Sequence, residues 1–411
     1  MASQSPNKGP NVPAHVPPEC VGSFNLYKSP EMRPTPFGDP FAAVGKLHEG
    51  PSVFYSPETT RDGQGAWIVT SAEDQRTVLQ DGTTFSSYRR IFSSAIGEDW
   101  PVIPLELDPP EHGKYRSMLN PLMSPKRIAA LEPFVTAKAV ELIEGLKARG
   151  TSAEIMTEFA FPLAVSVFLA FLGIPDDRLM EFVGWANELL HMGPAERTAA
   201  AHKILGFLDG MIAKRKTEPG EDFMTFLVQA ELEGRPLNDQ EIRSIAVLLF
   251  IGGLDTVATA IGLDLYYLAR NPDRQQELRD NPDIMPSAVE EMLRAFPSVT
   301  PIRTATRDVE LSGCPIRKGD LVSCPSMASS RDPAEFPDPE TVDFNREDNR
   351  HTAFAYGPHR CLGSHLARRE LIIALQEWFA RIPPFRIKDG TAPITYGGFV
   401  FGVENLVLDW S

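Results

Sequence analysis

The fold of this chain can be assigned from ten residues near its C-terminal end, Phe354-Ala355-Tyr356-Gly357-Pro358-His359-Arg360-Cys361-Leu362-Gly363. A single cysteine, Cys361, stands between two glycines, and a strongly apolar segment with helical spacing follows it. Glycine allows a close approach of the backbone and backbone angles that other residues avoid. A helix that begins just after Cys361 would point N–H groups and the positive end of its dipole at the sulfur, which favours the thiolate. The stretch therefore suits a thiolate held against a flat cofactor.

The alternative for Cys361 is a buried free thiol, the usual state of an intracellular cysteine. The surrounding residues favour a ligand, because the stretch resembles the haem-ligand loop of the cytochrome P450 family, Phe-Gly-x-Gly-x-His-x-Cys-x-Gly. Five residues match that pattern: Phe354, Gly357, His359, Cys361 and Gly363. Ala355 stands where the family usually has glycine. The resemblance implies heme b (iron protoporphyrin IX) as the cofactor, with Cys361 as the iron ligand and His359 near a haem propionate.

The composition indicates a large globular core. The chain has 411 residues, of which 42% are hydrophobic, and its interior has no Gly/Ser linker, repeat or block of like charge. We expect an extended proline-rich segment over residues 1–39 and a single domain over residues 40–411. With no apolar signal segment and no run of about 18 apolar residues, we expect a soluble cytoplasmic protein that does not use a membrane.

The net charge and the spacing of the cysteines argue against a nucleic-acid partner, a metal cluster and a disulfide framework. The net charge of −15, from 40 basic and 55 acidic residues, argues against nucleic acid as a partner. The four cysteines are Cys20, Cys314, Cys324 and Cys361. None of them forms a CxxC or a zinc spacing, so neither a metal cluster nor a disulfide framework is expected.

Apolar periodicity predicts a mainly α fold with small β-sheets. A strand pair is expected over 53–55 and 66–70, followed by a helix that Ser71 caps. The longest predicted helix begins at Asn238, with Glu241 as a capping partner, and runs to about Arg270. Because it is apolar on most faces, we expect it to be central and buried.

The middle of this long helix contains Gly252-Gly253-Leu254-Asp255-Thr256, where the two glycines would weaken the helix locally. One interpretation is a close helix contact at the glycines, with Thr256 bonded back to its own helix. The other is functional, since the segment resembles the oxygen-activation motif of the P450 family, Ala/Gly-Gly-x-Asp/Glu-Thr. That resemblance implies that Thr256 orients the oxygen ligand and Asp255 feeds protons to it. Gly252 and Gly253 would make room above the iron.

Other charged residues match family positions for haem propionates. His112 and Arg116 lie four residues apart after a diproline, and Arg303 follows the segment 299–302. The resemblance implies that these three and His359 bind the propionates. The alternative for His112 and Arg116 is a solvated amphipathic helix. A further trio, Glu291, Arg294 and Arg346, resembles the structural Glu-x-x-Arg pair of the family with its later arginine; alone, the i, i+3 pair would be an ordinary surface ion pair.

The resemblance narrows to bacterial camphor hydroxylases, on the helix after the ligand loop and on residues 252–257. Those are three-component enzymes, in which an NADH-dependent ferredoxin reductase and a [2Fe–2S] ferredoxin supply electrons. A basic docking surface is therefore expected. Its candidate residues are Lys114, Arg116, Lys126, Arg127, Arg360, Arg368 and Arg369.

The substrate site departs from that of the camphor enzyme. Trp100 stands where the camphor enzyme has a tyrosine that bonds the ketone. The other residues expected to line the site are Leu248, Ile251, Gly252, Val299, Phe399 and Val400. A compact terpenoid fits such apolar walls, either a monoterpenoid such as cineole or camphor or a norisoprenoid. The alternative is that Trp100 packs in the core and never contacts substrate.

The leading hypothesis is a monomeric haem-thiolate monooxygenase that uses O2 and reduced ferredoxin. A peroxide-driven peroxygenase is a rival, which the pair Asp255-Thr256 disfavours. A non-catalytic haem-thiolate sensor or ligand-binding protein would need no such pair. A cofactor-free all-α binding protein would leave Cys361 and His359 without a role.

Overall fold

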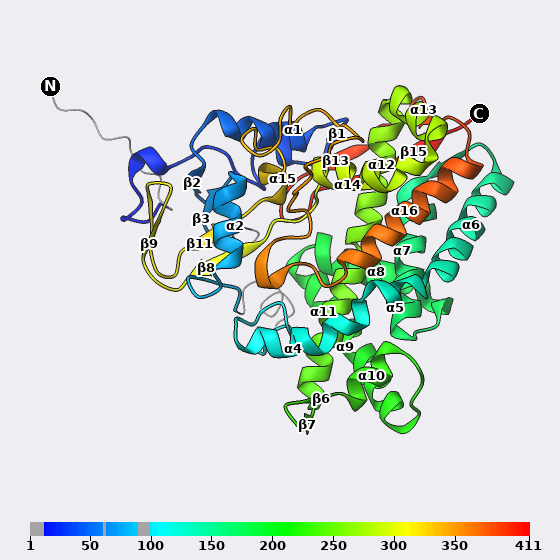
Figure 1. Ribbon diagram of the computed structural model, residues 1–411, viewed down its shortest axis with the longest axis horizontal. Helices are drawn as coiled ribbons and strands as arrows, with labels where there is room; N and C mark the ends of the chain where they lie inside the picture. The colour runs from blue at the N-terminus through cyan, green and yellow to red at the C-terminus, as the bar shows by residue number, and fades with distance from the viewer. Residues whose placement is uncertain (1–11, 61–62, 89–98) are drawn as a thin grey trace. The chain divides into compact units, whose positions relative to one another are not determined.

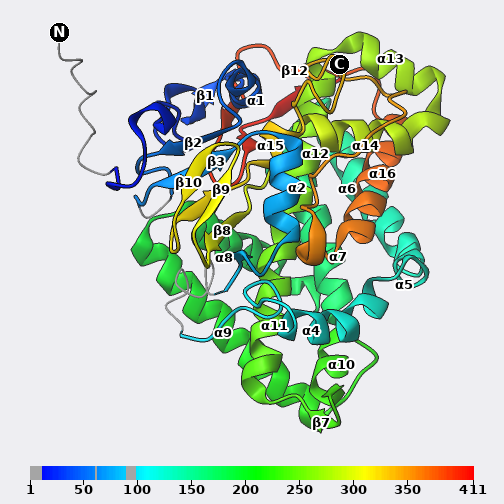
Figure 2. The same cartoon turned by 60° about the vertical axis from the view of Figure 1, so that its left-hand side comes forward.

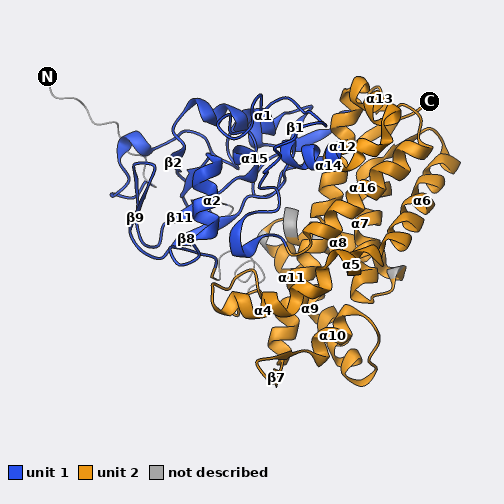
Figure 3. Ribbon diagram, in the orientation of Figure 1, with its two compact units in different colours: residues 1–87, 287–361, 392–404 blue, residues 88–286, 362–391, 405–411 orange. Residues whose placement is uncertain are grey.

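The computed structural model describes residues 12–60, 63–88 and 99–411. The chain divides into two compact units, drawn in two colours in Figure 3. Unit 1 comprises residues 1–87, 287–361 and 392–404, and unit 2 comprises residues 88–286, 362–391 and 405–411. The chain passes from one unit to the other five times, so neither unit is a continuous stretch of sequence. The single domain expected from residue 40 stays a prediction.

Unit 1 is built on a five-stranded sheet in the order β2-β3-β11-β8-β4. Its strands are β2 (Val53–Ser56), β3 (Ala66–Val69), β4 (Phe85–Ser86), β8 (Ile302–Ala305) and β11 (Leu321–Ser323). β3 and β11 are parallel and the other neighbours antiparallel, which confirms the predicted β2–β3 pair. Helix α2 (Ala72–Gln80) buries Val78 and Leu79 in the same apolar cluster as Trp67 of the sheet, and Figure 2 shows it beside the strands. The Ser71 hydroxyl caps α2, as predicted.

The rest of unit 1 consists of short elements. They are β1 (Thr35–Pro36), β9 (Val309–Leu311), β10 (Cys314–Ile316), β13 (Ile394–Tyr396), β14 (Gly402–Glu404), α1 (Pro40–Gly45) and α15 (Ser326–Ser329). The described part of the N-terminal segment, residues 12–39, contains short turns and β1 but no α-helix. Its side chains Val16, Leu26 and Met32 are fully buried, so this part of the segment is packed against the protein.

Unit 2 is mostly helical. Its helices are α4 (Glu111–Leu119), α5 (Pro125–Ala129), α6 (Glu132–Arg149), α7 (Phe161–Leu172), α8 (Leu179–His191), α9 (Pro194–Thr217), α10 (Phe223–Gln229), α11 (Asp239–Leu254), α12 (Thr256–Arg270), α13 (Pro272–Asp280) and α16 (Ser364–Arg381). Helix α14 (Met285–Ala295) begins in unit 2 and continues into unit 1. The strands of unit 2 are β5 (Ser152–Glu154), β6 (Glu231–Leu232), β7 (Arg235–Pro236), β12 (Arg386–Ile387) and β15 (Val407–Asp409). Figure 1 shows α6 and α16 packed side by side.

The longest predicted helix is interrupted. It begins as expected, because the Asn238 side chain and Glu241 form a reciprocal capping box at the start of α11. The helical pattern then breaks at Asp255 and resumes as α12. One continuous helix from 238 to 270 was therefore the wrong prediction, since the apolar pattern runs through the break without a change of period. The run Asp239–Arg270 is long and apolar enough to cross a membrane, and 67% of its most apolar window is buried inside the protein.

Candidate active site

The cysteine loop of unit 1 has a tightly bent backbone. Ala355 and Gly357 both lie in the left-handed region, with φ of 56° and 68°. The Cys361 N–H donates to the Phe354 carbonyl at 2.8 Å, which closes the loop on itself. A Cβ on Gly357 would lie 2.6 Å from the Leu79 carbonyl oxygen at the end of α2. Glycine is therefore required at 357, and Cys361 is held at an exposed position at the end of the loop.

Two basic side chains of unit 1 match the predicted propionate partners. His359 ends the turn Gly357–His359 and is 9% exposed. Arg303 is 6% exposed on β8, where its guanidinium donates to the Ile302 carbonyl at 3.0 Å. Unit 1 thus supplies a thiol that a metal can reach and two nearly buried donors for anionic groups.

The break between α11 and α12 rearranges one hydrogen bond. The Thr256 hydroxyl donates to the Gly252 carbonyl at 3.0 Å, in the place of a backbone N–H. The space beside Gly252 is open, because a Cβ there would meet no heavy atom within 4 Å. Asp255 is buried at the break itself. The arrangement places an acid, an alcohol and an exposed turn of backbone together on unit 2, which is what proton delivery beside a bound ligand requires.

The two glycines have different roles, and this corrects one expectation. A Cβ on Gly253 would lie 2.2 Å from the ring of Phe168 on α7. Gly253 therefore permits close packing of α7 on α11, as the helix-contact interpretation proposed. Only Gly252 borders open space, so only Gly252 can make room for a ligand.

Helix α4 carries His112 and Arg116. His112 is buried, and the Arg116 Nε donates to Asn120 Oδ1 at 3.0 Å. Between them Tyr115 donates its hydroxyl to Glu241 Oε1 at 2.7 Å, which ties α4 to the start of α11. His112 is buried and Arg116 is partly exposed, a pattern that an amphipathic helix also gives, so the propionate role of the two residues stays a prediction.

Glu241 is the centre of a network that sequence reasoning missed. Besides Tyr115, it accepts two hydrogen bonds from the Arg235 guanidinium, at 2.8 and 2.7 Å, and one from the Asn238 backbone. The Arg235 hydrogen bonds lower the pKa of Glu241 to about 2, against an opposing effect of burial. Burial and the Glu241 carboxylate raise the pKa of Tyr115 to about 12. The capping position of Glu241 was the only sequence signal, and it pointed to a helix end alone.

The residues predicted to line the substrate site fall into two groups, one in each unit. In unit 2, Trp100 and Ile251 belong to one buried apolar cluster, and Leu248 packs against it. Trp100 is 6% exposed, which agrees with the interpretation that it packs in the core. In unit 1, Val299 and Val400 form a β-bridge, and the Thr300 N–H donates to the Phe399 carbonyl at 3.1 Å.

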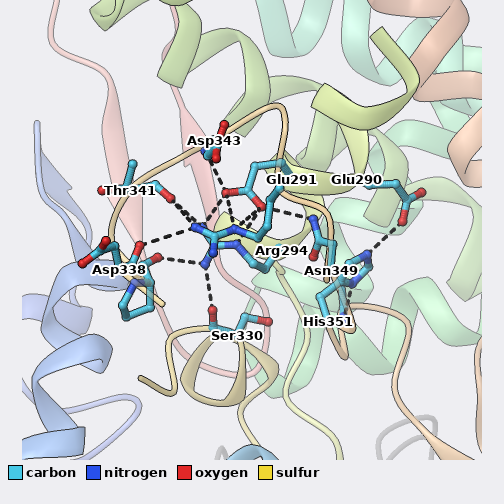
Figure 4. A network of polar contacts seen from close by, with 12 residues as sticks. Glu290, Glu291, Arg294, Ser330, Asp338, Thr341, Asp343, Asn349 and His351 are labelled. Carbon is cyan, nitrogen blue, oxygen red and sulfur yellow. Dashed lines mark hydrogen bonds and ion pairs between the residues drawn. The ribbon is translucent and has the colours of Figure 1, made fainter. Parts of the chain in front are cut away.

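The predicted trio forms a buried network in unit 1 (Figure 4). Arg294 donates twice to Glu291 at 2.8 Å, and Arg346 Nε reaches the same carboxylate at 3.1 Å. Both side chains of the first pair are essentially unexposed. The remaining donors of Arg294 go to backbone carbonyls of residues 330, 339 and 341. An ordinary surface ion pair is excluded, and the trio is structural as predicted.

Each unit carries some of the groups that a haem needs. A haem of this kind needs a thiolate ligand, donors for two carboxylates and an open face for a small ligand. Unit 1 offers the exposed Cys361 with Arg303 and His359, and unit 2 offers the open backbone at Gly252 and the helix with His112.

Comparison with known proteins agrees with this chemistry. A family model described as cytochrome P450 matches residues 192–381. A probable cytochrome P450 127A1 of Sinorhizobium fredii is 56% identical and covers 97% of both chains. The chain belongs to the cytochrome P450 family. Within this P450 family, pentalenic acid synthase of Streptomyces avermitilis is 34% identical over 93% of this chain and 96% of its own length.

Solved structures extend the agreement to the fold. The crystal structure of CYP101C1 matches this P450 with a TM-score of 0.86 and 34% identity, covering 97% of this chain and all of its own. CYP101J2 matches with the same TM-score and 31% identity, over 99% of this chain. The predicted family, the mainly α fold with small sheets and heme b as the cofactor are confirmed. The chain is thus a cytochrome P450 monooxygenase of bacterial type.

Proposed function

We propose that this P450 hydroxylates a compact terpenoid, with electrons that pass from NADH through a ferredoxin reductase and a [2Fe–2S] ferredoxin. The observation that carries the proposal is the broken helix, where Thr256 bonds to Gly252 beside open space. Heme b, when bound by Cys361, supplies the reductive activation of dioxygen. We assign Thr256 the orientation of the oxygen ligand and Asp255 the delivery of protons from the interior of unit 2.

The cofactor assignment is tested by the spectrum of the reduced protein with carbon monoxide. Thiolate ligation by Cys361 is expected to give a strongly red-shifted Soret band, and Cys361→His to abolish that band while still binding haem. A wild-type spectrum typical of histidine ligation would overturn the role of Cys361. Propionate binding is tested with two variants, Arg303→Ala and Arg116→Ala, each of which should lose haem to a haem-scavenging globin faster than the wild-type protein.

The role of Thr256 is tested by removing its hydroxyl. Thr256→Ala should leave NADH consumption intact but lower the product formed per NADH by roughly 10-fold or more, because the oxygen ligand loses the hydroxyl that orients it for proton delivery. Thr256→Ser is the matched control, because serine keeps the hydroxyl and the bond to Gly252. Unchanged coupling in Thr256→Ala would overturn the role of Thr256, and the absence of any hydroxylated product from the wild-type protein would favour a sensor or ligand-binding role. Activity with hydrogen peroxide alone, equal to that with ferredoxin, would favour a peroxygenase.

The substrate class rests on the apolar residues of both units. Val299, Phe399 and Val400 in one unit and Ile251 and Leu248 in the other offer hydrocarbon surface. We propose a monoterpenoid such as cineole or camphor, or a norisoprenoid, as the substrate. Spin-state titration with a terpenoid panel tests this, and Trp100→Phe separates the two interpretations of the indole. If Trp100 only packs in the core, the variant should keep its dissociation constants within about 2-fold.

The electron donor is proposed from the basic residues of the predicted docking surface. Two of them are already paired within unit 2, Lys114 with Glu233 and Arg369 with Glu132. Arg360 directly precedes Cys361 and Arg368 lies on the helix that follows it, so these two are the first to test. Replacement of each by glutamine should raise the KM for ferredoxin and weaken its dependence on salt, without a change in terpenoid binding. We further propose that the protein is a monomer in the cytoplasm. Its mass in solution measures the oligomeric state directly.

A further inference from the structure

Two cysteines that are far apart in the sequence lie in contact in unit 1. Cys20 and Cys314 are 294 residues apart, and their sulfur atoms are 3.3 Å apart. Both are free thiols. A disulfide needs a sulfur separation of about 2.05 Å, so a small side-chain movement would suffice to join them. Nothing in the oxygenase mechanism uses either residue.

The backbone around both cysteines is fixed. Near Cys20, the His15 ring contacts Asp320 at 2.8 Å, and the Gly22 N–H donates to the Tyr55 carbonyl at 2.9 Å. These contacts hold the N-terminal segment on the five-stranded sheet. Cys314 is the first residue of β10 and pairs with Leu311 of β9. The two sulfurs therefore face each other from anchored segments, and their closeness is not a chance meeting of loose loops.

The two thiols differ in accessibility. Cys314 is 4% exposed, and burial followed by its interaction with Cys20 raises the pKa of its thiol to about 12. Cys20 is partly exposed, and the Cys314 S–H can donate either to its sulfur or to the Val53 carbonyl oxygen, each at 3.3 Å. Cys20 is thus the residue that an oxidant reaches first, and Cys314 is the residue placed to react second.

We propose that Cys20 and Cys314 are a peroxide-sensitive dithiol that closes to a disulfide. The Cys20 thiol attacks hydrogen peroxide, the O–O bond breaks, and one water leaves as Cys20 becomes a sulfenic acid. The Cys314 sulfur then attacks the Cys20 sulfur, the S–O bond breaks, and the Cys314 proton leaves with that oxygen as a second water. Two thiols are oxidised and one peroxide is reduced to two waters.

The bond would join the N-terminal segment covalently to the β9–β10 hairpin. The source of oxidant rests on the proposed function, since an oxygenase that reduces dioxygen without inserting oxygen releases hydrogen peroxide. Formation of the bond does not rest on it, because added peroxide serves equally well. A defect in catalysis and a failure of this pair to oxidise are therefore separate results.

The test is mass spectrometry of the purified holoprotein after treatment with a small excess of hydrogen peroxide. We expect the loss of two hydrogen atoms per chain, a peptide that links Cys20 to Cys314, and recovery of both thiols with a reductant. A second arm replaces peroxide by oxidised glutathione, which spares the haem and should yield the same linked peptide through a mixed disulfide on Cys20.

Single-cysteine variants complete the test. Cys20→Ser and Cys314→Ser should each abolish the linked peptide, whereas Cys324→Ser should retain it, because the sulfur contact joins Cys20 and Cys314. Cys20→Ser alters a partly exposed residue and keeps the test valid if Cys314→Ser does not fold. Sulfinic acid or a stable glutathione adduct on Cys20, with Cys314 still a thiol, would overturn the proposal. A link between two chains through Cys20 would do the same.

Discussion

At the scale of the residue, the cysteine loop uses left-handed backbone at one position that is not glycine. A non-glycine residue in that conformation costs roughly 1 kcal/mol. Ala355, with φ of 56°, carries this cost where the P450 pattern has glycine. We expect Ala355→Gly to raise the free energy of unfolding by about 0.5–1 kcal/mol, measured by urea denaturation.

Replacement of the second left-handed residue of the loop, Gly357, should lower the free energy of unfolding. Gly357→Ala adds both backbone strain and a clash with the Leu79 carbonyl, so it should cost about 2 kcal/mol or more. Gly390→Ala is the matched control. Gly390 has a similar φ of 80°, but a Cβ there meets nothing within 4 Å. Equal losses in the two variants would show that the packing on α2 has no effect.

A buried acid in α12 makes stability depend on pH. Burial raises the pKa of Asp264 well above its usual value, and its Oδ2 has no hydrogen-bond partner among the described residues. The folded state then binds its proton more tightly than the unfolded state, so stability falls as pH rises above about 4. Asp264→Asn should flatten this decline and gain about 1–3 kcal/mol over wild type at neutral pH.

The matched control for Asp264 is an exposed acid. Asp389 lies in an exposed turn of the same unit, so Asp389→Asn should leave the pH profile of the unfolding midpoint unchanged. Burial raises the pKa of Glu370 in α16 in the same way, so Glu370 also contributes to the decline of wild-type stability with rising pH. A profile of Asp264→Asn that parallels wild type between pH 5 and 8 would contradict the expected effect.

At the scale of the element, the Glu241 network determines how α4 is held. Glu241 has a pKa of about 2 in the folded protein, below its ordinary value near 4.5. Its contribution is therefore complete above pH 4.5 and is lost as pH falls toward 2. We expect Glu241→Gln to cost about 2 kcal/mol at pH 7, measured by urea denaturation, and less at pH 3.

Tyr115→Phe tests the same contact by changing the residue that α4 contributes to it. It removes one hydroxyl and one hydrogen bond, so it should cost about 1 kcal/mol. Because Tyr115 lies next to Arg116 on α4, the variant should also speed haem loss. Faster haem loss without loss of stability would place the effect on the orientation of α4. A stability loss with normal haem retention would show that α4 keeps its orientation without the bond.

At the scale of the whole molecule, the Glu291–Arg294–Arg346 network joins α14 to the loops between residues 330 and 349. Removing one partner leaves an uncompensated buried charge, so Arg294→Ala should cost about 3–5 kcal/mol, measured by thermal unfolding of the purified protein. Lys147→Ala removes an ion pair of the same i, i+3 spacing at the surface and should cost under about 0.5 kcal/mol. Similar losses in both variants would contradict the structural role of the network.

The local features of this P450 were predictable because short motifs encode them. The β2–β3 pair, the Ser71 cap and the start of α11 follow from residues only a few positions apart. The break at Asp255 was not predictable from the sequence, because apolar residues continue through it. The hydrogen bond at the break comes from a side chain, that of Thr256, and not from the backbone. The Tyr115–Glu241 bond and the Cys20–Cys314 contact join distant segments, and no local period records such pairs. The roles of Asp255, Thr256 and the residues of the substrate site remain predictions.

The order of strands in the sheet of unit 1 has a consequence for synthesis on the ribosome. Trp67 of β3 pairs with Val322 of β11, roughly 250 residues later. At about 5–20 residues per second, the nascent β2–β3 hairpin exists for roughly 10–50 s before its partner strand is made. During that interval one edge of β3 has no neighbour, and such edges recruit strands from other chains. Chaperone demand during translation should therefore be concentrated on the first hundred residues.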